Sequence, residues 1–163
     1  KITNRFSEIG NKVILKKENI NEVLKLNINY LKKRNSSLIK FKFLPIKYNV
    51  NCLINKTLFD WVIENLVKNS IDSMRGKGII QITILKSKGK IDVCIKDNGK
   101  GINDILKKKI FNSGFTTKDK GWGLGLSLAK RIITEHHNGE IYLKKSELNV
   151  GTEIVISIPV LQK

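Results

Sequence analysis

The sequence predicts a single domain of the α+β class. Residues 80–84 and 91–95 place apolar residues at every second position, as half-buried strands do, and residues 154–158 repeat isoleucine at the same period. Two others space their apolar residues along one face of a helix, 20–31 and 58–67. A chain of 163 residues without an internal repeat or a low-complexity linker fits one such domain.

The N-terminal half is expected to hold two long helices, each preceded by an asparagine that can cap it. Asn19, with Glu22 three positions later, is typical of a capping box, and Asn55 takes the same place before the second helix. Apolar residues recur at every second position between the two helices, and a short strand is also expected before the first. The expected order is strand, helix, strand, strand and helix, at residues 13–18, 19–33, 39–43, 50–54 and 55–74.

The C-terminal half is expected to contain four strands, one helix and a long connection. Two strands joined by a Lys-Gly-Lys turn lead into a glycine-rich loop, a helix follows to about His136, and two strands come last. The expected strands are residues 80–84, 91–96, 141–143 and 154–158. Six of the twelve glycines lie between Asp97 and Leu126, so a ligand can approach the backbone most closely in this connection.

Composition excludes several classes of protein. The two cysteines, Cys52 and Cys94, lie in apolar strands and are too few for a disulfide framework or a zinc site. No apolar run approaches the length that spans a bilayer. The net charge of +17 raises the alternative of a basic nucleic-acid-binding module. Because the lysines are spread along the chain and no basic strand is interleaved with aromatic residues, we expect no nucleic-acid partner.

The glycine-rich connection begins with the pattern DxGxG at the end of a strand, formed by Asp97, Gly99 and Gly101. Glycine lets a flat ligand come close to the backbone, and a carboxylate offers acceptors but no donor. A planar amino group is therefore a suitable partner for Asp97. Glycine clusters are more often simple turns, so this pattern alone is a weak signal.

The same connection ends with the pattern GxGxG, formed by Gly121, Gly123 and Gly125, which runs into a helix. Exposed amides at a glycine-rich helix N-terminus can bind phosphate. One loop can thus hold a base-like ring at one end and a phosphate at the other, and together these describe a nucleotide.

One face of the second long helix is polar, although the rest of the helix is largely apolar. Asn65, Asn69 and Asp72 follow one another at steps of four and three and so share that face. A single asparagine in such a place usually faces solvent, but three stacked oxygen-bearing side chains suit Mg²⁺ beside a triphosphate. We therefore interpret this face as functional.

The two histidines, His136 and His137, lie at the expected end of a helix. A histidine there interacts favourably with the helix dipole, and the chain contains no HExxH pattern. We interpret the pair as structural rather than catalytic.

The chain resembles sensor histidine kinases in four segments that share their order and spacing. They match the N box, first glycine box, F box and second glycine box of that family: ENLVKNSIDSM, DNGKGI, IFNSGFTTK and GWGLGLSLAKRII. The resemblance extends to the closing GTEIVISIP and so covers nearly the whole chain. It implies an ATP-binding domain of the GHKL superfamily with the Bergerat fold. Such a domain is a two-layer α/β sandwich with a mixed, mostly antiparallel sheet of about five strands and three helices on one face.

The resemblance also implies a role for each motif in binding ATP and Mg²⁺. Asn69 would coordinate the metal ion, Asp97 would accept a hydrogen bond from the adenine amino group, and Thr152 would contact adenine through water. Lys118, in a short lid over the nucleotide, would reach the phosphates, and Asn65, Asn69 and Lys118 would form the catalytic centre. The other cofactor-binding positions implied are Asp72, Gly99, Gly101, Ile102, Phe111, Phe115, Thr116, Thr117, Gly121, Gly123, Leu124, Gly125 and Leu126.

Within that set, the glycines of the first box would let the adenine ring lie against the backbone. Those of the second box would offer amides to the phosphates. The two phenylalanines of the F box would anchor the lid.

One position departs from the family pattern at the phosphate end. Kinases of this group commonly carry Lys or Arg three residues after the metal-binding asparagine, where this chain has Asp72. A phosphate contact must then come from another cation, and the sequence leaves three open: Lys68, Arg75 and Lys118.

A second departure concerns the general base. Related ATPases such as gyrase B, and the mitochondrial-type protein kinases, place a Glu where this chain has Asn65. An amide cannot act as a general base at neutral pH. This substitution favours phosphorylation of an already nucleophilic imidazole over hydrolysis of ATP.

These implications give the expected function. Residues 12–163 are expected to be the catalytic domain of a two-component sensor histidine kinase, which transfers the γ-phosphoryl group of ATP to a histidine. Residues 1–11 resemble the end of an upstream dimerisation hairpin that carries this acceptor, so the fragment alone is expected to bind Mg-ATP without labelling itself.

The expected partners are that hairpin and a response regulator receiver domain, with a homodimer only in a longer chain. A cytoplasmic location is expected for the domain, whether or not the parent chain is anchored in the inner membrane. A serine/threonine kinase of the anti-sigma-factor type shares the fold and the boxes and remains the alternative. Acid-stable phosphate on a partner protein would distinguish it.

Overall fold

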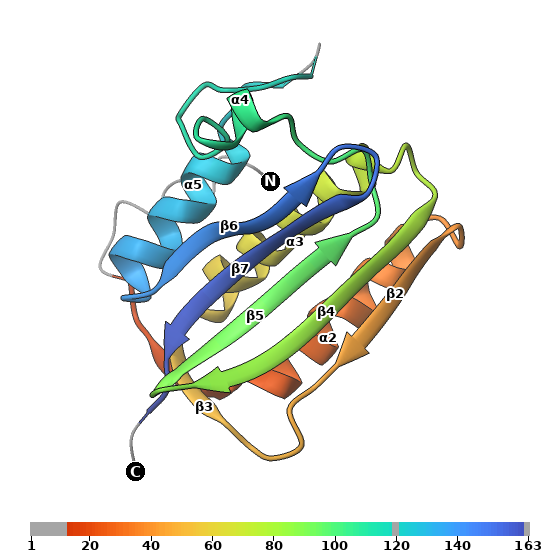
Figure 1. Ribbon diagram of the computed structural model, residues 1–163. Helices are drawn as coiled ribbons and strands as arrows, with labels where there is room; N and C mark the ends of the chain where they lie inside the picture. Colours follow the sequence, from red (N-terminus) through yellow and green to blue (C-terminus); the bar gives the residue numbers. More distant parts are fainter. Residues whose placement is uncertain (1–12, 119–120, 162–163) are drawn as a thin grey trace.

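A five-stranded sheet forms one layer of the molecule and helices form the other (Figure 1). The computed structural model describes residues 13–118 and 121–161. The sheet order is β2-β4-β5-β7-β6, in which β2 and β4 are parallel and the other neighbours are antiparallel. These strands are β2 Ile39–Leu44, β4 Gly78–Ser87, β5 Lys90–Asp97, β6 Glu140–Glu147 and β7 Gly151–Pro159. A separate antiparallel ribbon pairs β1 (Lys16–Asn19) with β3 (Asn51–Ile54).

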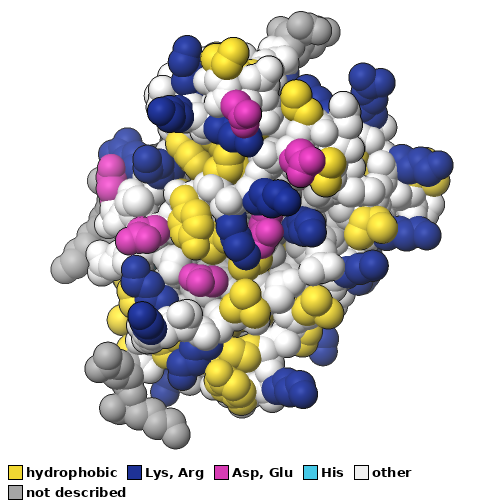
Figure 2. All heavy atoms as spheres, in the orientation of Figure 1, with side chains coloured by type: hydrophobic (Ala, Val, Ile, Leu, Met, Phe, Trp, Pro, Cys, Tyr) yellow, Lys and Arg dark blue, Asp and Glu magenta, His cyan; other side chains and the backbone are white. Residues whose placement is uncertain are grey.

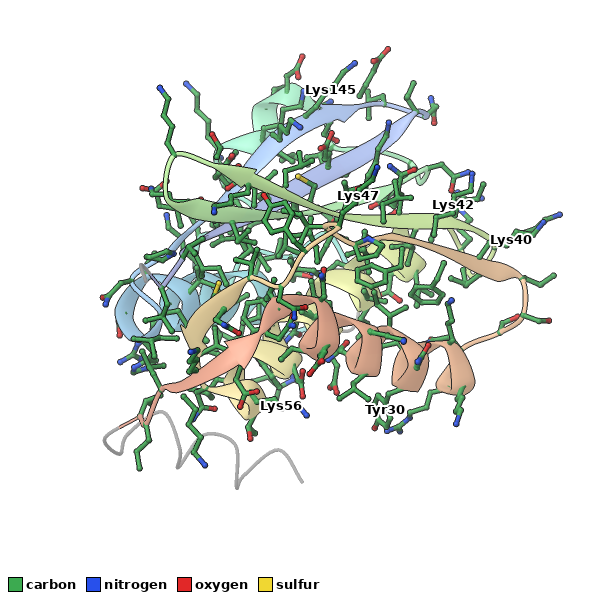
Figure 3. All side chains as sticks on the ribbon, turned by 90° about the horizontal axis from the view of Figure 1, so that it is seen from below. Tyr30, Lys40, Lys42, Lys47, Lys56 and Lys145 are labelled. Carbon is green, nitrogen blue, oxygen red and sulfur yellow. The ribbon has the colours of Figure 1, made fainter. Side chains whose placement is uncertain are left out.

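Within the described residues, three main helices cover one face of the sheet, and Figure 3 shows the two layers edge-on. They are α2 (Ile20–Arg34), α3 (Lys56–Ser73) and α5 (Gly125–Arg131). The last continues as the π-helical turn η1 (Ile132–His136), and the short helix α4 (Asp104–Lys107) lies in the glycine-rich connection. The mixed, mostly antiparallel two-layer sandwich that the sequence predicts is therefore confirmed.

The hydrophobic core lies between the two layers. Alternate residues of β4 and β5 point towards the helices, and Ile80, Ile82 and Ile91 are fully buried there. On the helix side, α3 contributes Phe59 and Leu66, which are at most 2% exposed. Because this buried stripe fixes how α3 is turned about its axis, it also fixes which residues of α3 lie outside the core.

Asparagine side chains begin both long helices, as expected. Asn19 Oδ1 accepts a hydrogen bond from the backbone of Asn21 at 3.0 Å, and Asn55 Oδ1 accepts one from the backbone of Leu58 at 3.0 Å. Each bond satisfies an N–H group that the helix itself leaves without a partner. The cap at Asn55 sets the start of α3, the helix that carries the polar face.

The opposite face of the sheet carries acidic, basic and apolar side chains mixed together (Figure 2). Lys40 and Lys42 belong to the edge strand β2, and Lys145 belongs to the other edge strand, β6 (Figure 3). Lysines on edge strands oppose pairing with another sheet.

The expected element order is confirmed, with local differences. β1 begins at Lys16 rather than at residue 13, and α4, four residues long, is too short to produce a periodic pattern in the sequence. The helix expected to reach His136 becomes π-helical from Ile132. The segment expected to end an upstream hairpin, residues 1–11, lies outside the described residues.

Both cysteines are free and buried, and burial raises the pKa of the Cys52 thiol to about 11. Each acts as a small apolar side chain, as expected. In the part of the chain that the structure describes, no helix combines the length and the apolar character needed to cross a membrane.

Candidate nucleotide site

The polar face of α3 is turned towards the glycine-rich turn that opens α5. Asn65 Nδ2 donates to the carbonyl of Trp61 at 3.0 Å, which leaves its Oδ1 pointing at Gly125. A Cβ atom on Gly125 would lie 3.2 Å from that oxygen, so a side chain here would require the Asn65 amide to shift slightly. The structure therefore brings the asparagine helix and the second glycine box together.

One turn further along α3, a lysine from a distant loop reaches the same polar face. Lys118 Nζ lies 3.0 Å from Asn69 Oδ1 and 2.5 Å from Asp72 Oδ2. The side chains of Lys118 and Asp72 are 41% and 39% exposed, so solvent screens this ion pair substantially. Of the three cations left open by the sequence, Lys118 is the one that the structure places on these oxygens; Lys68 and Arg75 are exposed.

Asp97 ends β5 on the other flank of α3, with only 6% of its surface exposed. Its Oδ1 accepts hydrogen bonds from the Gly99 amide at 2.9 Å and from Ser73 Oγ at 3.2 Å. Its Oδ2 accepts one from Ser70 Oγ at 2.9 Å. Because these donors hold both oxygens, the carboxylate has one fixed orientation.

The glycines after Asp97 are required by contacts within the protein. A Cβ atom on Gly99 would lie 1.9 Å from Ser73 Oγ, and one on Gly101 would lie 2.0 Å from the carbonyl oxygen of Glu147. Gly101 also has a φ of +69°, where other residues are strained. Glycine at these two positions therefore lets the turn pack against α3 and the β6–β7 connection. This requirement holds whether or not a nucleotide base lies beside the turn.

Thr152 lies directly beside Asp97, since the two residues are paired across β5 and β7. Its hydroxyl is 2.9 Å from Ser146 Oγ, and Ser146 Oγ accepts a hydrogen bond from the backbone of Ile102 at 2.9 Å. Ser146 thereby links β6, β7 and the first glycine box.

The predicted lid is tied together at its base. The Gly114 amide donates to the carbonyl of Gly123 at 3.1 Å, and a Cβ atom on Gly123 would lie 2.4 Å from the Gly114 carbonyl carbon. Phe111, at the start of the lid, packs against the hydrophobic core. Lys130 Nζ lies 5.8 Å from the centre of the Phe111 ring.

The remaining lid residues are more exposed. Phe115 is half-buried, Thr116 and Thr117 are exposed, and Thr116 Oγ1 accepts a hydrogen bond from the Lys118 amide at 3.1 Å. At the start of α5, no side chain caps the helix, while the half-buried Leu126 packs against the core. The first amides of this helix, after Leu124, are therefore not bonded to a capping side chain.

Comparison with known proteins decides the family. Residues 55–162 match the protein family described as Histidine kinase-, DNA gyrase B-, and HSP90-like ATPase. This span contains every site residue described above. The chain belongs to this family.

Individual relatives narrow the likeness to histidine kinases. Sporulation kinase A of Bacillus subtilis (strain 168) is 39% identical over 98 residues, which cover 60% of this chain and 16% of that protein. The solved, nucleotide-free catalytic domain of the histidine kinase ThkA is 32% identical, with a TM-score of 0.79. The match covers 89% of this chain and 95% of the ThkA domain.

A second solved structure holds histidine kinase ThkA in complex with response regulator protein TrrA. It is 28% identical with a TM-score of 0.79, and the match covers 98% of this chain and 46% of that chain. The match thus includes nearly all of the ThkA catalytic domain, while this chain spans only 16% of the length of sporulation kinase A.

His137 of this histidine kinase-like domain has a structural role. It is 2% exposed, its Nε2 accepts a hydrogen bond from the Asn55 amide at 3.1 Å, and its Nδ1 lies 2.9 Å from the Ile132 carbonyl oxygen. Burial lowers the pKa of His137 from its usual 6.5, so the ring is neutral at pH 7. The contact with the Ile132 carbonyl at the end of this helix is in keeping with the structural interpretation of His137, although burial opposes a charged ring there.

The donor set of the polar face is suited to Mg²⁺. The described residues contain no group of three or more His, Cys, Asp or Glu side chains that could hold a metal ion by themselves. Asn69 and Asp72 nevertheless both direct an oxygen at one cationic group, the ammonium of Lys118. Amide and carboxylate oxygens are hard ligands of the kind Mg²⁺ uses together with waters and phosphates.

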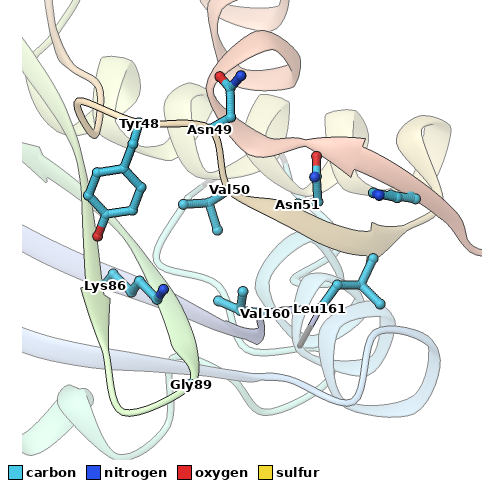
Figure 4. A pocket seen from close by; sticks show the side chains of 9 residues that line it. Tyr48, Asn49, Val50, Asn51, Lys86, Gly89, Val160 and Leu161 are labelled. Carbon is cyan, nitrogen blue, oxygen red and sulfur yellow. The ribbon is translucent and has the colours of Figure 1, made fainter. Parts of the chain in front are cut away.

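Two hollows can be compared with this arrangement, one distant from it and one at its border. One, of about 720 Å³, is at the opposite end of the sheet beside the β4–β5 turn, where Tyr48, Lys86, Gly89 and Leu161 are among the lining residues (Figure 4). None of the predicted nucleotide-binding residues lines it. A smaller one, of about 370 Å³, borders Ile102 on the side of α4.

Sequence reasoning missed three buried or half-buried serines at the site: Ser70, Ser73 and Ser146. Ser70 did carry a signal, because it falls in the apolar stripe of α3, and a hydroxyl in such a place needs a partner. No sequence pattern indicated Ser146. Its place opposite Thr152 follows a register shift in β6 that cannot be recognised in the sequence.

Proposed function

We propose that this domain binds ATP with Mg²⁺ and presents the γ-phosphoryl group to a histidine on a partner segment. The observation that carries the proposal is the arrangement of α3. One flank of this helix meets a buried carboxylate, Asp97, and the other meets a cation, Lys118, at Asn69 and Asp72. The same helix thus lies between an acceptor suited to a nucleotide base, Asp97, and groups suited to a metal-bound triphosphate, at Asn69 and Asp72.

The base end would be formed by Asp97 and Thr152. Asp97 is buried and ionisable, and its side chain can accept from an amino group but cannot donate in its ionised form. Thr152 stands next to it across the strand pair, where its hydroxyl can hold a water against the same ring. Gly99, Gly101 and Ile102 shape the turn that borders this end.

The phosphate end would be formed by the glycine turn and the lid. Gly121, Gly123 and Gly125 lead into a helix start that no side chain caps, and amides in such a turn can bind phosphate oxygens. Asn69 and Asp72 would hold Mg²⁺, whose role is to neutralise charge on the phosphates. Lys118 would leave these two oxygens and pair with the phosphates instead.

The reacting group on the acceptor would need no strong base in this domain. Asn65 occupies the place of a basic carboxylate in related ATPases, and an amide does not take up a proton at neutral pH. A neutral imidazole is already a nucleophile, so positioning and charge neutralisation would provide most of the catalysis. Asn65, Asn69 and Lys118 are the residues we assign to this task.

The acceptor histidine would come from outside the described residues. His137 is buried and bonded at both ring nitrogens, and the Nε2 atom of His136 is buried as well. We assign the acceptor to an upstream dimerisation hairpin, and the next recipient to a response regulator receiver domain. The similar structure of histidine kinase ThkA in complex with response regulator protein TrrA supports the second assignment. We place residues 12–163 in the catalytic domain, and the domain in the cytoplasm.

The binding half of this proposal is tested by calorimetry with ATP, with and without Mg²⁺. We expect saturable binding that weakens when the metal is removed by chelation, and that is lost when Asn69 is changed to Ala in the presence of Mg²⁺. An ATP affinity that changes neither on removal of Mg²⁺ nor in Asn69→Ala would overturn the assignment of Mg²⁺ binding to the polar face of α3.

A further inference from the structure

The carboxylate of Asp97 is held mainly by the helix that faces it. Ser70 and Ser73, at i and i+3 on α3, direct their hydroxyls at its two oxygens, at 2.9 Å and 3.2 Å. Ser70 is 6% exposed and so cannot exchange this partner freely for water. The third donor, the Gly99 amide, belongs to the turn that Ser73 itself contacts.

These bonds leave little acceptor capacity for a ligand. An ionised carboxylate offers about four acceptor positions. The Ser70 hydroxyl and the Gly99 amide each take one, and the Ser73 hydroxyl shares its single proton between Asp97 Oδ1 and the carbonyl of Ser70. About one to two positions then remain, which an exocyclic amino group can fill with its N–H groups.

The hydroxyl proton of Ser70 is directed at Asp97, so Ser70 Oγ can face a ligand only as an acceptor. At the base end, Asp97 and Ser70 therefore both offer acceptors to a ligand, and neither offers a free donor. A 6-aminopurine satisfies such a surface, whereas a 6-oxopurine would place its carbonyl oxygen against oxygen atoms. A buried mismatch of this kind is costly because neither side can bond to water.

From this geometry we infer that Ser70 and Ser73 are positioning residues that set the selectivity of the site for 6-aminopurines. They act through Asp97 by fixing its orientation and by using up its surplus acceptor positions. The inference rests on the proposed function, since it assumes that a nucleotide base lies against Asp97.

The two serines should contribute unequally. Ser70 is the protein donor recorded on Oδ2, whereas Oδ1 keeps the Gly99 amide when Ser73 is removed. Ser73 Oγ also has a second acceptor, the carbonyl of Ser70 at 2.8 Å, so its single proton is divided between two partners. Loss of the Ser70 hydroxyl should thus disturb the carboxylate more.

The test compares binding of Mg-ATP and Mg-ITP, which carry a 6-amino and a 6-oxo group on the same ribose triphosphate. The proteins are the unchanged chain, Ser70→Ala, Ser73→Ala and, as a matched control, Ser87→Ala at an exposed position at the far end of β4. We expect Ser70→Ala to weaken ATP binding by about three- to tenfold, the usual range for one hydrogen bond, and to change ITP binding by less than about twofold. Ser73→Ala should give a smaller change in the same direction, and Ser87→Ala none.

The ratio of the two affinities separates positioning from general damage to the fold. Equal losses for ATP and ITP in Ser70→Ala, or an unchanged ATP to ITP ratio in both site variants, would overturn the inference while leaving the proposed function intact. An unchanged chain that binds neither nucleotide would instead overturn the proposed function, and this inference with it.

Discussion

Lys118 and Asn69 are 49 residues apart in the chain, yet Lys118 Nζ lies 3.0 Å from Asn69 Oδ1. The contact joins the last residue of the F box to the helix that carries the polar face. A tethered ammonium thus lies at the oxygens that we assign to Mg²⁺. Binding of Mg-ATP would exchange this internal cation for the metal ion and release Lys118 towards the phosphates.

The first prediction concerns this lysine. Lys118→Ala should weaken Mg-ATP binding by about tenfold, the order of a charge-assisted hydrogen bond. The same change should alter the free energy of unfolding by less than about 1 kcal/mol, since exposed ion pairs contribute little. Calorimetry and thermal unfolding measure the two effects. Lys40→Ala, an exposed lysine on β2, is the matched control, and equal ATP affinities in the two variants would contradict the role of Lys118.

The second prediction concerns recognition of the base. Asp97→Ala should weaken binding of adenine nucleotides by about ten- to a hundredfold, because it removes a charge-assisted acceptor from a buried site. Asp92→Ala is the control, since Asp92 lies on the same strand but on the face turned away from the helices. If calorimetry gives both variants the affinity of the unchanged chain, Asp97 does not contact the base.

The third prediction uses the buried histidine. Burial lowers the pKa of His137, so below its ordinary value of 6.5 the unfolded chain takes up a proton that the folded chain resists. The contribution of His137 to the free energy of unfolding should therefore be complete above about pH 6.5. It should fall at lower pH, by at most about 1.4 kcal/mol per pH unit. Urea unfolding between pH 7.5 and 5.5 measures the slope.

Substitution identifies the group responsible for that slope. His137→Gln should remove most of the pH dependence in this window, although it will lower stability at pH 7.5. His136→Gln should retain the pH dependence. A slope that persists in His137→Gln would assign it to other groups.

The fourth prediction separates a strained backbone from a close contact. Gly101 and Gly76 both have positive φ, +69° and +81°, but a Cβ atom on Gly76 meets nothing within 4 Å. Gly76→Ala should therefore cost only the conformational term, about 1–2 kcal/mol. Gly101→Ala should cost clearly more, because its Cβ atom would lie 2.0 Å from the Glu147 carbonyl oxygen. Chemical denaturation measures the free energy of unfolding of both variants. Equal losses would show that the turn at Gly101 moves away from Glu147 without cost.

The fifth prediction concerns the lid. Thr116, Thr117 and Lys118 are exposed, and segments with few buried contacts exchange their amide hydrogens readily. Their amides should gain protection when Mg-ATP binds, while that of the buried Leu66 in α3 should change little. Hydrogen exchange that is equal with and without Mg-ATP would count against a lid.

The sequence was informative where a local pattern determines the structure. Asn55 could be recognised as a cap, and the spacing of Asn65, Asn69 and Asp72 placed them on one face, because a helix has a fixed period. Partners across long distances were not readable in this way. The contact of Ser70 with Asp97 joins residues 27 apart, and it depends on how α3 packs on β5.

The glycines show a different limit. The sequence assigned Gly99 and Gly101 to the space for a ring, whereas the structure shows that contacts with Ser73 and Glu147 already require them. A glycine pattern marks close approach of the backbone but does not say whether the neighbour is a ligand or the protein itself.

The central claim is that this domain supplies a phosphoryl group to a histidine held on another segment. The most direct measurement incubates the chain with γ-labelled ATP and Mg²⁺, first alone and then with the parent's acceptor hairpin added in trans, and follows the acid and base stability of any labelled product. We predict no labelling of the chain alone and, with the hairpin, an acid-labile, base-stable phosphate that is absent with Asn69→Ala. Labelling of His136 or His137 in the chain alone, an acid-stable product on a partner, or rapid ATP hydrolysis that Asn65→Ala abolishes would contradict the account.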